Sequence, residues 1–220
     1  SSTGPKTQTS FMKSANRKLT AERQKFNSDE ELYFSWLLRD LKKGGWIVGA
    51  QYEPPPWVLT ERLDLHYQKQ LKTKRKQEKS FMWSAHKYTC DFKIVWKPEA
   101  ESCLFWKPGG SYRKIPPFVA QDIDGRPTTF IEVKPAFDFN NMTREVRIKV
   151  AMVHRLYGQV VQIVKVPNAF RDIFTPKRFI WTDTGKQFRK IGGKRVTERK
   201  DYRTLEQLVN QMGGKQKELL

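Results

Sequence analysis

The sequence holds few of the residues that build metal-linked or disulfide-linked folds. Its two cysteines are Cys90 and Cys103, and its three histidines are scattered along the chain. This set shows no zinc-ligand spacing, which argues against a zinc site. A disulfide between Cys90 and Cys103 is geometrically possible. A basic chain without an amino-terminal apolar signal region instead favours a reducing compartment and free thiols.

Long apolar runs and acidic residues are also scarce. No run approaches the roughly 20 apolar residues that span a bilayer, so we expect no membrane-spanning helix. Asp and Glu number 23 against 42 Lys and Arg, which leaves a formal charge of +19. Such a charge favours a nucleic-acid partner and, less often, an anionic membrane surface. The 220 residues suit one domain of ordinary size with extensions.

The most informative stretch is residues 128–135, Thr-Thr-Phe-Ile-Glu-Val-Lys-Pro. Its apolar members predict a buried strand. Side chains alternate along a strand, so Glu132 and Lys134 share one face, while Ile131 and Val133 share the other. Burying either charge alone is costly. The two charged residues therefore pair with each other, lie exposed at a strand end, or form part of a functional site.

Two further acidic residues precede this strand. Asp91 lies in a strand-like run over residues 88–96, and Ser28 with Glu31 forms a capping box that predicts a helix start. We favour Glu31 over Glu30 as the helix acid because Glu31 falls on the inward face of that helix. Carboxylates from a helix and two strands, beside a lysine, suit a hard divalent cation such as Mg²⁺, with Mn²⁺ as a substitute.

Elements on either side of residues 128–135 are predicted from local patterns. The Asp-Gly pair at 124–125 predicts a hairpin turn in preference to a metal loop. A helix is expected over residues 143–157, followed by a strand over 159–166 and a parallel crossover. The apolar stripe of that helix comprises Val146, Val150, Val153 and Leu156.

Three segments concentrate the positive charge. Residues 1–27 predict a phosphate-binding arm or a solubilising tail. Residues 66–79 lack Gly and Pro and are interpreted as helical, forming a DNA-backbone contact or a solvated face. Residues 168–220 carry basic residues interspersed with aromatics, which either stack on bases or pack on the core. The expected DNA contacts in the second segment are Lys69, Lys72, Lys74, Arg75 and Lys76.

The order of these motifs resembles the PD-(D/E)xK nuclease superfamily, in particular small phage-type endonucleases and Holliday-junction resolvase-like enzymes. The similarity covers roughly residues 28–166. It implies an α/β fold with a restriction-endonuclease-like core, in which a mixed central β-sheet is flanked by helices. The domains would be a basic arm (1–27), a nuclease core (28–167) and a basic carboxyl-terminal extension (168–220).

The sequence departs from the family pattern in two places. Cys90 precedes Asp91 where the family has Pro-Asp, which weakens the resemblance more than the chemistry. The interval from Asp91 to Glu132 is longer than usual for such enzymes. It implies an inserted hairpin or loop between the two metal-binding strands.

The resemblance implies a Mg²⁺-dependent endodeoxyribonuclease. The catalytic residues would be Glu31, Asp91, Glu132 and Lys134. Of these, Asp91 and Glu132 would hold the metal together with the Val133 carbonyl, and Glu31 would complete the site. Family members also carry a basic residue on the following helix, for which Arg147 and Lys149 are the candidates. The partner would be DNA, with homodimers in resolvases of this type, and the expected location is the cytoplasm, of a host cell if a phage encodes the chain.

Alternatives to this function remain open from the sequence. The charge equally supports a non-catalytic nucleic-acid-binding or packaging protein on the same fold, and an RNA-binding protein of ribosomal type is a further reading. The intact set of Asp91, Glu132 and Lys134 favours the enzyme, because a non-catalytic protein would be free to lose it. Branched DNA is one of the candidate substrates.

Overall fold

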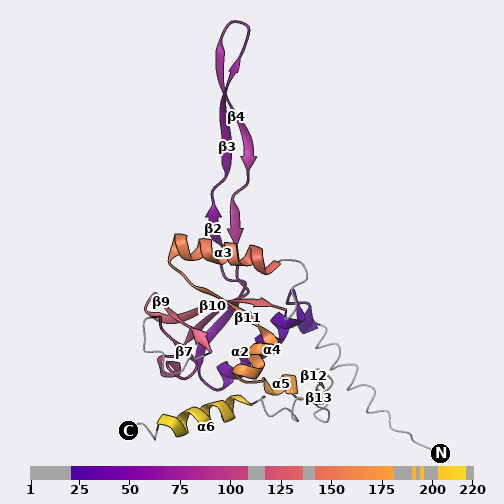
Figure 1. The fold of residues 1–220 in the computed structure, drawn as a ribbon, viewed down its shortest axis with the longest axis vertical. Helices are drawn as coiled ribbons and strands as arrows, with labels where there is room; N and C mark the ends of the chain where they lie inside the picture. The colour runs from indigo at the N-terminus through magenta and orange to yellow at the C-terminus, as the bar shows by residue number, and fades with distance from the viewer. Residues whose placement is uncertain are drawn as a thin grey trace, which may run out of the picture.

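A five-stranded sheet forms the centre of the protein in the computed structural model (Figure 1). The structure describes residues 21–108, 117–135, 142–180, 190–191, 194–195 and 203–216. The strands run in the order β1-β6-β10-β11, and β9 also pairs with β10. Their bounds are β1 (Ile47–Tyr52), β6 (Phe92–Trp96), β9 (Gln121–Ile123), β10 (Arg126–Lys134) and β11 (Val161–Lys165).

The sheet is mixed, as the sequence predicts. β10 pairs antiparallel with β6 and β9, and parallel with β11. A parallel pair needs a crossover connection, which α3 (Met142–Tyr157) supplies between β10 and β11. The strand, helix and strand order expected over residues 128–166 is therefore confirmed. β10 is the most buried strand because its neighbours and both covering layers enclose it.

The first described long helix, α2 (Asp29–Lys43), begins and ends where the sequence predicts. Ser28 Oγ accepts a hydrogen bond from the Glu31 backbone N–H, as a capping box requires. Gly45 adopts a φ of 75° just after the helix, which an L side chain tolerates poorly. The inward face includes Phe34, Leu37 and Leu41, each contributing about 1.5–3 kcal/mol by burial.

The two faces of the sheet support separate hydrophobic clusters. Ile131 and Val133 face the larger cluster, which includes α2, whereas Phe130 faces a smaller cluster with Val153 of α3. The alternation predicted for β10 is therefore confirmed. Along α3, Val146 and Val153 are buried, but Leu156 is 53% exposed. Its predicted place in the buried apolar stripe is therefore wrong, because Leu156 lies on the exposed side of α3.

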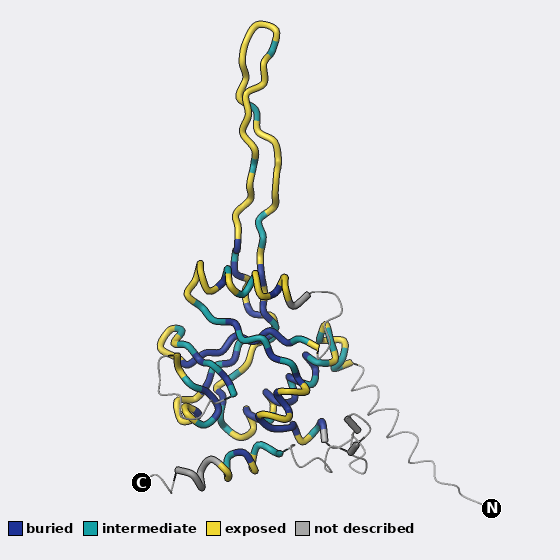
Figure 2. Tube along the Cα trace, viewed as in Figure 1, coloured by how far each residue is buried: buried dark blue, intermediate teal, exposed yellow. Residues whose placement is uncertain are grey.

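A long hairpin projects from the body of the protein (Figures 1 and 2). Its base is the antiparallel pair of β2 (Trp57–Thr60) and β5 (His86–Tyr88), and its shaft is β3 (Leu63–Gln70) with β4 (Arg75–Trp83). We call β3, β4 and the turn between them the arm. The helix predicted over residues 66–79 is wrong: period-two alternation at Leu63, Leu65 and Tyr67 indicates strand, and the lack of Gly and Pro does not oppose it.

The insertion implied by the long interval between Asp91 and Glu132 is present. It contains a short 3₁₀ helix, η1 (Pro98–Ala100), and the parallel pair of β7 (Phe105–Trp106) with β8 (Phe118–Val119). The Asp124-Gly125 turn joins β9 to β10 with positive φ at both residues, which confirms the predicted hairpin. Within the central sheet, Trp96 Nε1 of β6 donates to Thr129 Oγ1 of β10 at 2.8 Å, which ties these two strands together.

Carboxyl-terminal segments pack against the α2 side of the sheet where they are described. Phe170, Phe179 and Leu208 belong to the larger hydrophobic cluster. Trp181 and Phe188, two aromatics of the predicted basic extension, lie outside the described residues, as does most of the basic amino-terminal segment 1–27. No helix in the described part of the chain is long and apolar enough to cross a membrane. The elements of the carboxyl-terminal part of the chain are α4 (Val166–Asp172), α5 (Lys177–Ile180), β12 (Lys190–Ile191), β13 (Lys194–Arg195) and α6 (Leu205–Gln216).

Candidate active site

The register of β6 and β10 brings two of the predicted acids together. Phe92 pairs with Ile131 in the antiparallel ladder, and the next positions in this register are Asp91 and Glu132. Residues opposite each other in an antiparallel pair direct their side chains to the same face. The Asp91 carboxylate also accepts a hydrogen bond from the Val133 backbone N–H at 2.6 Å, which holds the carboxylate against β10.

Glu132 is buried, with 5% of its surface exposed, and both carboxylate oxygens have partners. Oε2 accepts a hydrogen bond from the Tyr88 hydroxyl at 2.7 Å, and Oε1 lies 2.7 Å from Lys134 Nζ. The pairing of Glu132 with Lys134 that the sequence allows is therefore present. Burial of this carboxylate is tolerable because it is hydrogen-bonded and paired with an opposite charge.

Lys134 connects the strand with the beginning of α3. Its side chain is 14% exposed. The pKa of Glu145 on α3 is lowered first by its ion pair with Lys149, and then by the charges of His86 and Lys134. The amino-terminal half of α3 therefore lies close to the paired Glu132 and Lys134. Lys134 is the cation that lies against the buried Glu132 carboxylate.

Burial and nearby negative charge change the proton affinity of the site. Burial, followed by repulsion from Glu132, raises the pKa of Asp91 to about 7, although the Val133 amide acts in the opposite direction. Burial also raises the pKa of the Cys90 thiol to about 12, so this cysteine stays protonated. The pKa of Tyr88 is raised above its ordinary value by burial and by Glu132. Tyr88 therefore remains a hydrogen-bond donor.

Glu31 lies at the start of α2, where several groups fix its position. One oxygen, Oε2, accepts hydrogen bonds from the Tyr52 hydroxyl at 2.6 Å and the Asn27 backbone N–H at 3.0 Å. The other accepts one from Ser28 Oγ at 2.9 Å. Glu31 is buried whereas Glu30 is partly exposed, which agrees with the preference for Glu31 as the inward acid. Its charge adds to the rise in the Asp91 pKa, so the two carboxylates are electrostatically coupled.

A hard divalent cation would fit the chemistry of these donors. Asp91 and Glu132 repel each other and share a face, and carboxylate oxygens keep lone pairs beyond those used by single hydrogen bonds. The Val133 carbonyl lies between the two charged residues of β10 and is the candidate third oxygen. Within the described ranges, no group of three or more His, Cys, Asp and Glu side chains lies close enough together to hold a metal ion.

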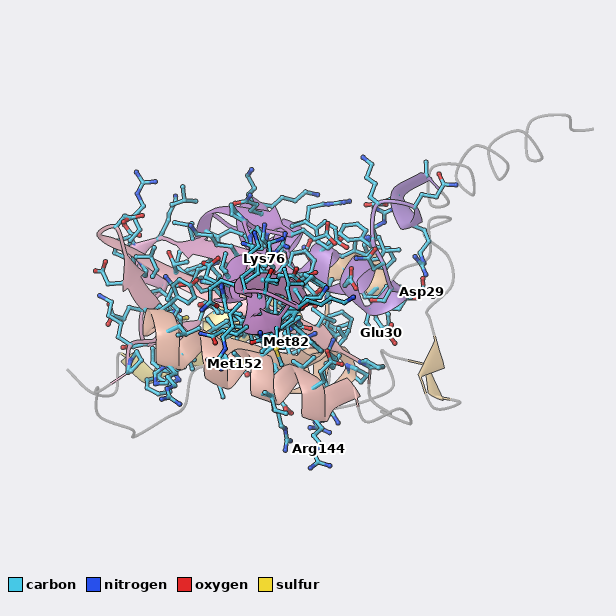
Figure 3. All side chains as sticks on the ribbon, turned by 90° about the horizontal axis from the view of Figure 1, so that it is seen from above. Asp29, Glu30, Lys76, Met82, Arg144 and Met152 are labelled. Carbon is cyan, nitrogen blue, oxygen red and sulfur yellow. The ribbon has the colours of Figure 1, made fainter. Side chains whose placement is uncertain are left out.

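The structure separates the predicted DNA-contact residues into two groups. Those of the 66–79 segment lie on the arm, outside the body of the protein. Arg147 is exposed on α3, whereas Lys149 pairs with Glu145. Figure 3, which looks down the arm, shows Arg144 of the same helix pointing away from the body. The arm group comprises Lys69, Lys72, Lys74, Arg75 and Lys76.

Sequence reasoning missed the two tyrosines that support the carboxylates. Tyr88 binds Glu132 across 44 sequence positions, and Tyr52 binds Glu31 across 21. Periodicity cannot reveal such contacts because they depend on how strands pair. The available signal for Tyr88 was its place three residues before Asp91. Comparisons with protein-family models, with curated proteins and with solved structures found no match for this chain.

Proposed function

We propose that this protein is a Mg²⁺-dependent endonuclease that hydrolyses phosphodiester bonds in DNA. The observation that carries the proposal is the juxtaposition of Asp91 with the buried Glu132 and Lys134 pair at the ends of adjacent strands. Two acids and a lysine in this arrangement suit a metal-assisted attack on a phosphate. Mn²⁺ is expected to replace Mg²⁺ because it accepts the same oxygen ligands.

Each side chain receives a role from its surroundings. Asp91, Glu132 and the Val133 carbonyl would hold the cation, which would supply Lewis-acid activation of the phosphate and of the attacking water. Lys134 would orient the water or neutralise charge that develops on the phosphate. Tyr88 fixes the Glu132 carboxylate, and Glu31 contributes a third negative charge near Asp91. Without a cation, these carboxylates would repel a phosphate.

The order of elements supports the assignment of a restriction-endonuclease-like core. Helix α2 carries Glu31, β6 follows Asp91, β10 carries Glu132 and Lys134, and α3 leads to the parallel β11. This is the order that the PD-(D/E)xK resemblance implies. The charge of +19 supports a polyanionic substrate, whose binding would weaken steeply with salt.

The first experiment compares cleavage of supercoiled plasmid with cleavage of a labelled four-way junction. Reactions contain Mg²⁺ or EDTA and use the native chain, Glu132→Ala or Lys134→Ala. Metal-dependent cutting that both variants lose is expected. Symmetric nicks confined to the junction would identify a branch-specific enzyme, and a dimer would account for the paired cuts. Tight binding without cutting under Mg²⁺ or Mn²⁺ would overturn the catalytic proposal.

A second candidate function is non-catalytic binding or packaging of nucleic acid. Glu132 favours it, because Tyr88 and Lys134 occupy both carboxylate oxygens in an arrangement that is stable without a metal. This candidate predicts that Glu132→Ala changes stability but leaves DNA affinity intact. It also predicts that Mg²⁺ produces no product on any DNA substrate.

A further inference from the structure

The arm is a two-stranded ribbon with solvent on both sides. β3 and β4 contribute eight and nine residues, and nearly all of them are exposed (Figure 2). A two-stranded hairpin of this kind gains little stability from its own contacts in water. Its side chains are therefore available to a ligand along the length of the ribbon.

The dimensions of the arm match a groove of duplex DNA. A two-stranded β-ribbon fits the B-DNA major groove, which is about 12 Å wide and about 8.5 Å deep. At about 3.3 Å per residue, the eight residues of β3 extend about 26 Å. This length corresponds to roughly eight base pairs, since successive phosphates of one strand advance about 3.4 Å along the helix axis.

Charge is concentrated at the distal half of the arm. Lys69 lies opposite Lys76 in the ladder, and both lie 3.6 Å from the single acid there, Glu78. Like charges directly opposite each other destabilise a ribbon, and one carboxylate cannot neutralise two ammonium groups. An anion at this end would relieve the repulsion. The distal cations are Lys69, Lys72, Lys74, Arg75 and Lys76, whereas Lys79 lies nearer the body and pairs with Asp64 at 3.0 Å.

The two faces of the distal ribbon differ in their chemistry. Ladder partners share a face, so Tyr67 with Glu78 and Lys69 with Lys76 lie on one side. The other side carries His66 with Lys79, Gln68 with Gln77, and Gln70 with Arg75. The side-chain amides of Gln68 and Gln77 make no hydrogen bond to any residue that the structure describes. Amides pair with adenine edges and arginine pairs with guanine edges in the major groove.

The arm is joined directly to the candidate active site. Its base strand β5 ends at Tyr88, whose ring stacks on Trp57 of β2 at 5.8 Å between ring centroids. The hydroxyl of the same tyrosine donates to Glu132. A duplex held by the arm would therefore be held at a defined position relative to Glu132.

We propose that the arm inserts into the major groove of duplex DNA beside the bond to be cleaved. The face with Gln68, Gln77 and Arg75 meets base edges, and the distal lysines meet the flanking phosphates. This inference rests on the proposed function for the identity of the ligand. It adds a contact of about eight base pairs to one side of the cleaved bond.

Binding without cleavage tests the arm separately from the nuclease. Affinity of the full chain for a labelled 30-base-pair duplex is measured in EDTA across a salt series, using Lys72→Gln/Lys74→Gln/Arg75→Gln/Lys76→Gln. The matched control removes four exposed charges from the body, with Lys42→Gln/Lys43→Gln/Lys97→Gln/Lys107→Gln. We expect the arm variant to flatten the slope of log affinity against log salt by about 3, one unit for each of its three phosphate-contacting lysines, and the control by less than about 1.

Methylation interference identifies the groove. Methyl groups at guanine N7 over about eight base pairs should block binding of the native chain, and the arm variant should lose that block. Equal slopes for the arm and control variants would overturn the proposal. It would also be overturned if guanine N7 methylation left binding unchanged while a minor-groove ligand competed with the protein for the duplex. A change of oligomeric state with unchanged DNA binding would also overturn it, and would identify the arm as a protein interface. Absence of cleavage under Mg²⁺ would reject the nuclease and leave the arm result intact.

Discussion

The Tyr88 hydroxyl donates a hydrogen bond of 2.7 Å to the buried Glu132 carboxylate, and it does so from the strand that carries the arm. This contact links the exposed ribbon, the sheet and the candidate active site. The carboxylate is held on its other oxygen by Lys134. Several consequences of this arrangement can be measured.

Removal of the Tyr88 hydroxyl should weaken both the fold and the site. Tyr88→Phe leaves one oxygen of Glu132 without its donor, at a cost of about 1–3 kcal/mol in the free energy of unfolding. Partners of metal-binding carboxylates typically affect activity by about 10- to 100-fold, so cleavage should slow by a similar factor. Urea titration and single-turnover cleavage measure the two effects. Tyr67→Phe is the control because its hydroxyl contacts the arm residue Glu78 at 3.2 Å, and it should change neither quantity.

Substitutions in the ion pair of Glu132 and Lys134 should affect the stability of the fold and the rate of cleavage differently. Lys134→Met leaves a buried carboxylate without its cation and should lower the free energy of unfolding by about 1–3 kcal/mol. The double variant Glu132→Gln/Lys134→Met removes both charges and should regain most of that stability. Cleavage should fall by at least about 100-fold in both proteins. Recovery of cleavage in the double variant would contradict the role assigned to the pair.

Ser28 and Glu31 share a helix cap but should differ in function. Ser28→Ala removes the hydrogen bond that its Oγ accepts from the Glu31 N–H and the one that it donates to Glu31 Oε1. It should cost about 1 kcal/mol of stability and slow cleavage less than Glu31→Gln does. Glu31→Gln keeps an acceptor for Tyr52 and removes the charge near Asp91. It should slow cleavage while changing stability by less than Ser28→Ala does. Equal effects of both substitutions on cleavage would reduce Glu31 to a structural cap.

The raised pKa of Asp91 predicts a pH-dependent stability in EDTA. The folded state binds this proton with a pKa of about 7, against an ordinary value of 3.8, so the contribution of Asp91 is full below about pH 4 and is lost as the pH rises through 7. Asp91→Asn should remove this dependence and be more stable than the native chain at pH 8 by an amount on the order of 2 kcal/mol.

Mg²⁺ should stabilise the native chain at pH 8, where the ionised Asp91 otherwise lowers its stability. A cation that binds the folded state at 100 times its dissociation constant stabilises it by about 2.7 kcal/mol. Thermal melts at pH 8 with and without Mg²⁺ should show this gain for the native chain and not for Asp91→Asn. An equal rise in both proteins would place the cation elsewhere.

The sequence predicted the elements whose residues contact near neighbours along the chain. The Ser28 cap, the Asp124-Gly125 turn and the alternation of Ile131 and Val133 are local patterns, and all three are present. The helix predicted over residues 66–79 is wrong because the lack of Gly and Pro is compatible with a strand as well, and the alternation of Leu63, Leu65 and Tyr67 indicates one. Charge reports solvent exposure, whereas periodicity reports backbone geometry.

The site was partly predictable for a related reason. Glu132 and Lys134 lie two residues apart, so strand geometry alone placed them on one face. Their proximity to Asp91 depends on the antiparallel register of β6 and β10, which no local pattern specifies, although the order of the acidic residues suggested that they converge. The hydrogen bond from Tyr88 to Glu132 depends on the chain running out along β3 and back along β4 to β5. No local sequence pattern predicts that the chain brings Tyr88 to Glu132.

Single-turnover cleavage by paired aspartate variants tests the central claim most directly. Asp91→Asn changes the acid that β6 places beside Glu132, whereas Asp122→Asn changes an acid of the β9 turn whose carboxylate accepts from the Gly125 N–H. Plasmid is mixed with excess protein at pH 8 in Mg²⁺, and nicked and linear products are followed with time. The account predicts that Asp122→Asn cuts at the native rate, and that Asp91→Asn cuts at least about 100-fold more slowly. Native cutting by Asp91→Asn would contradict the account.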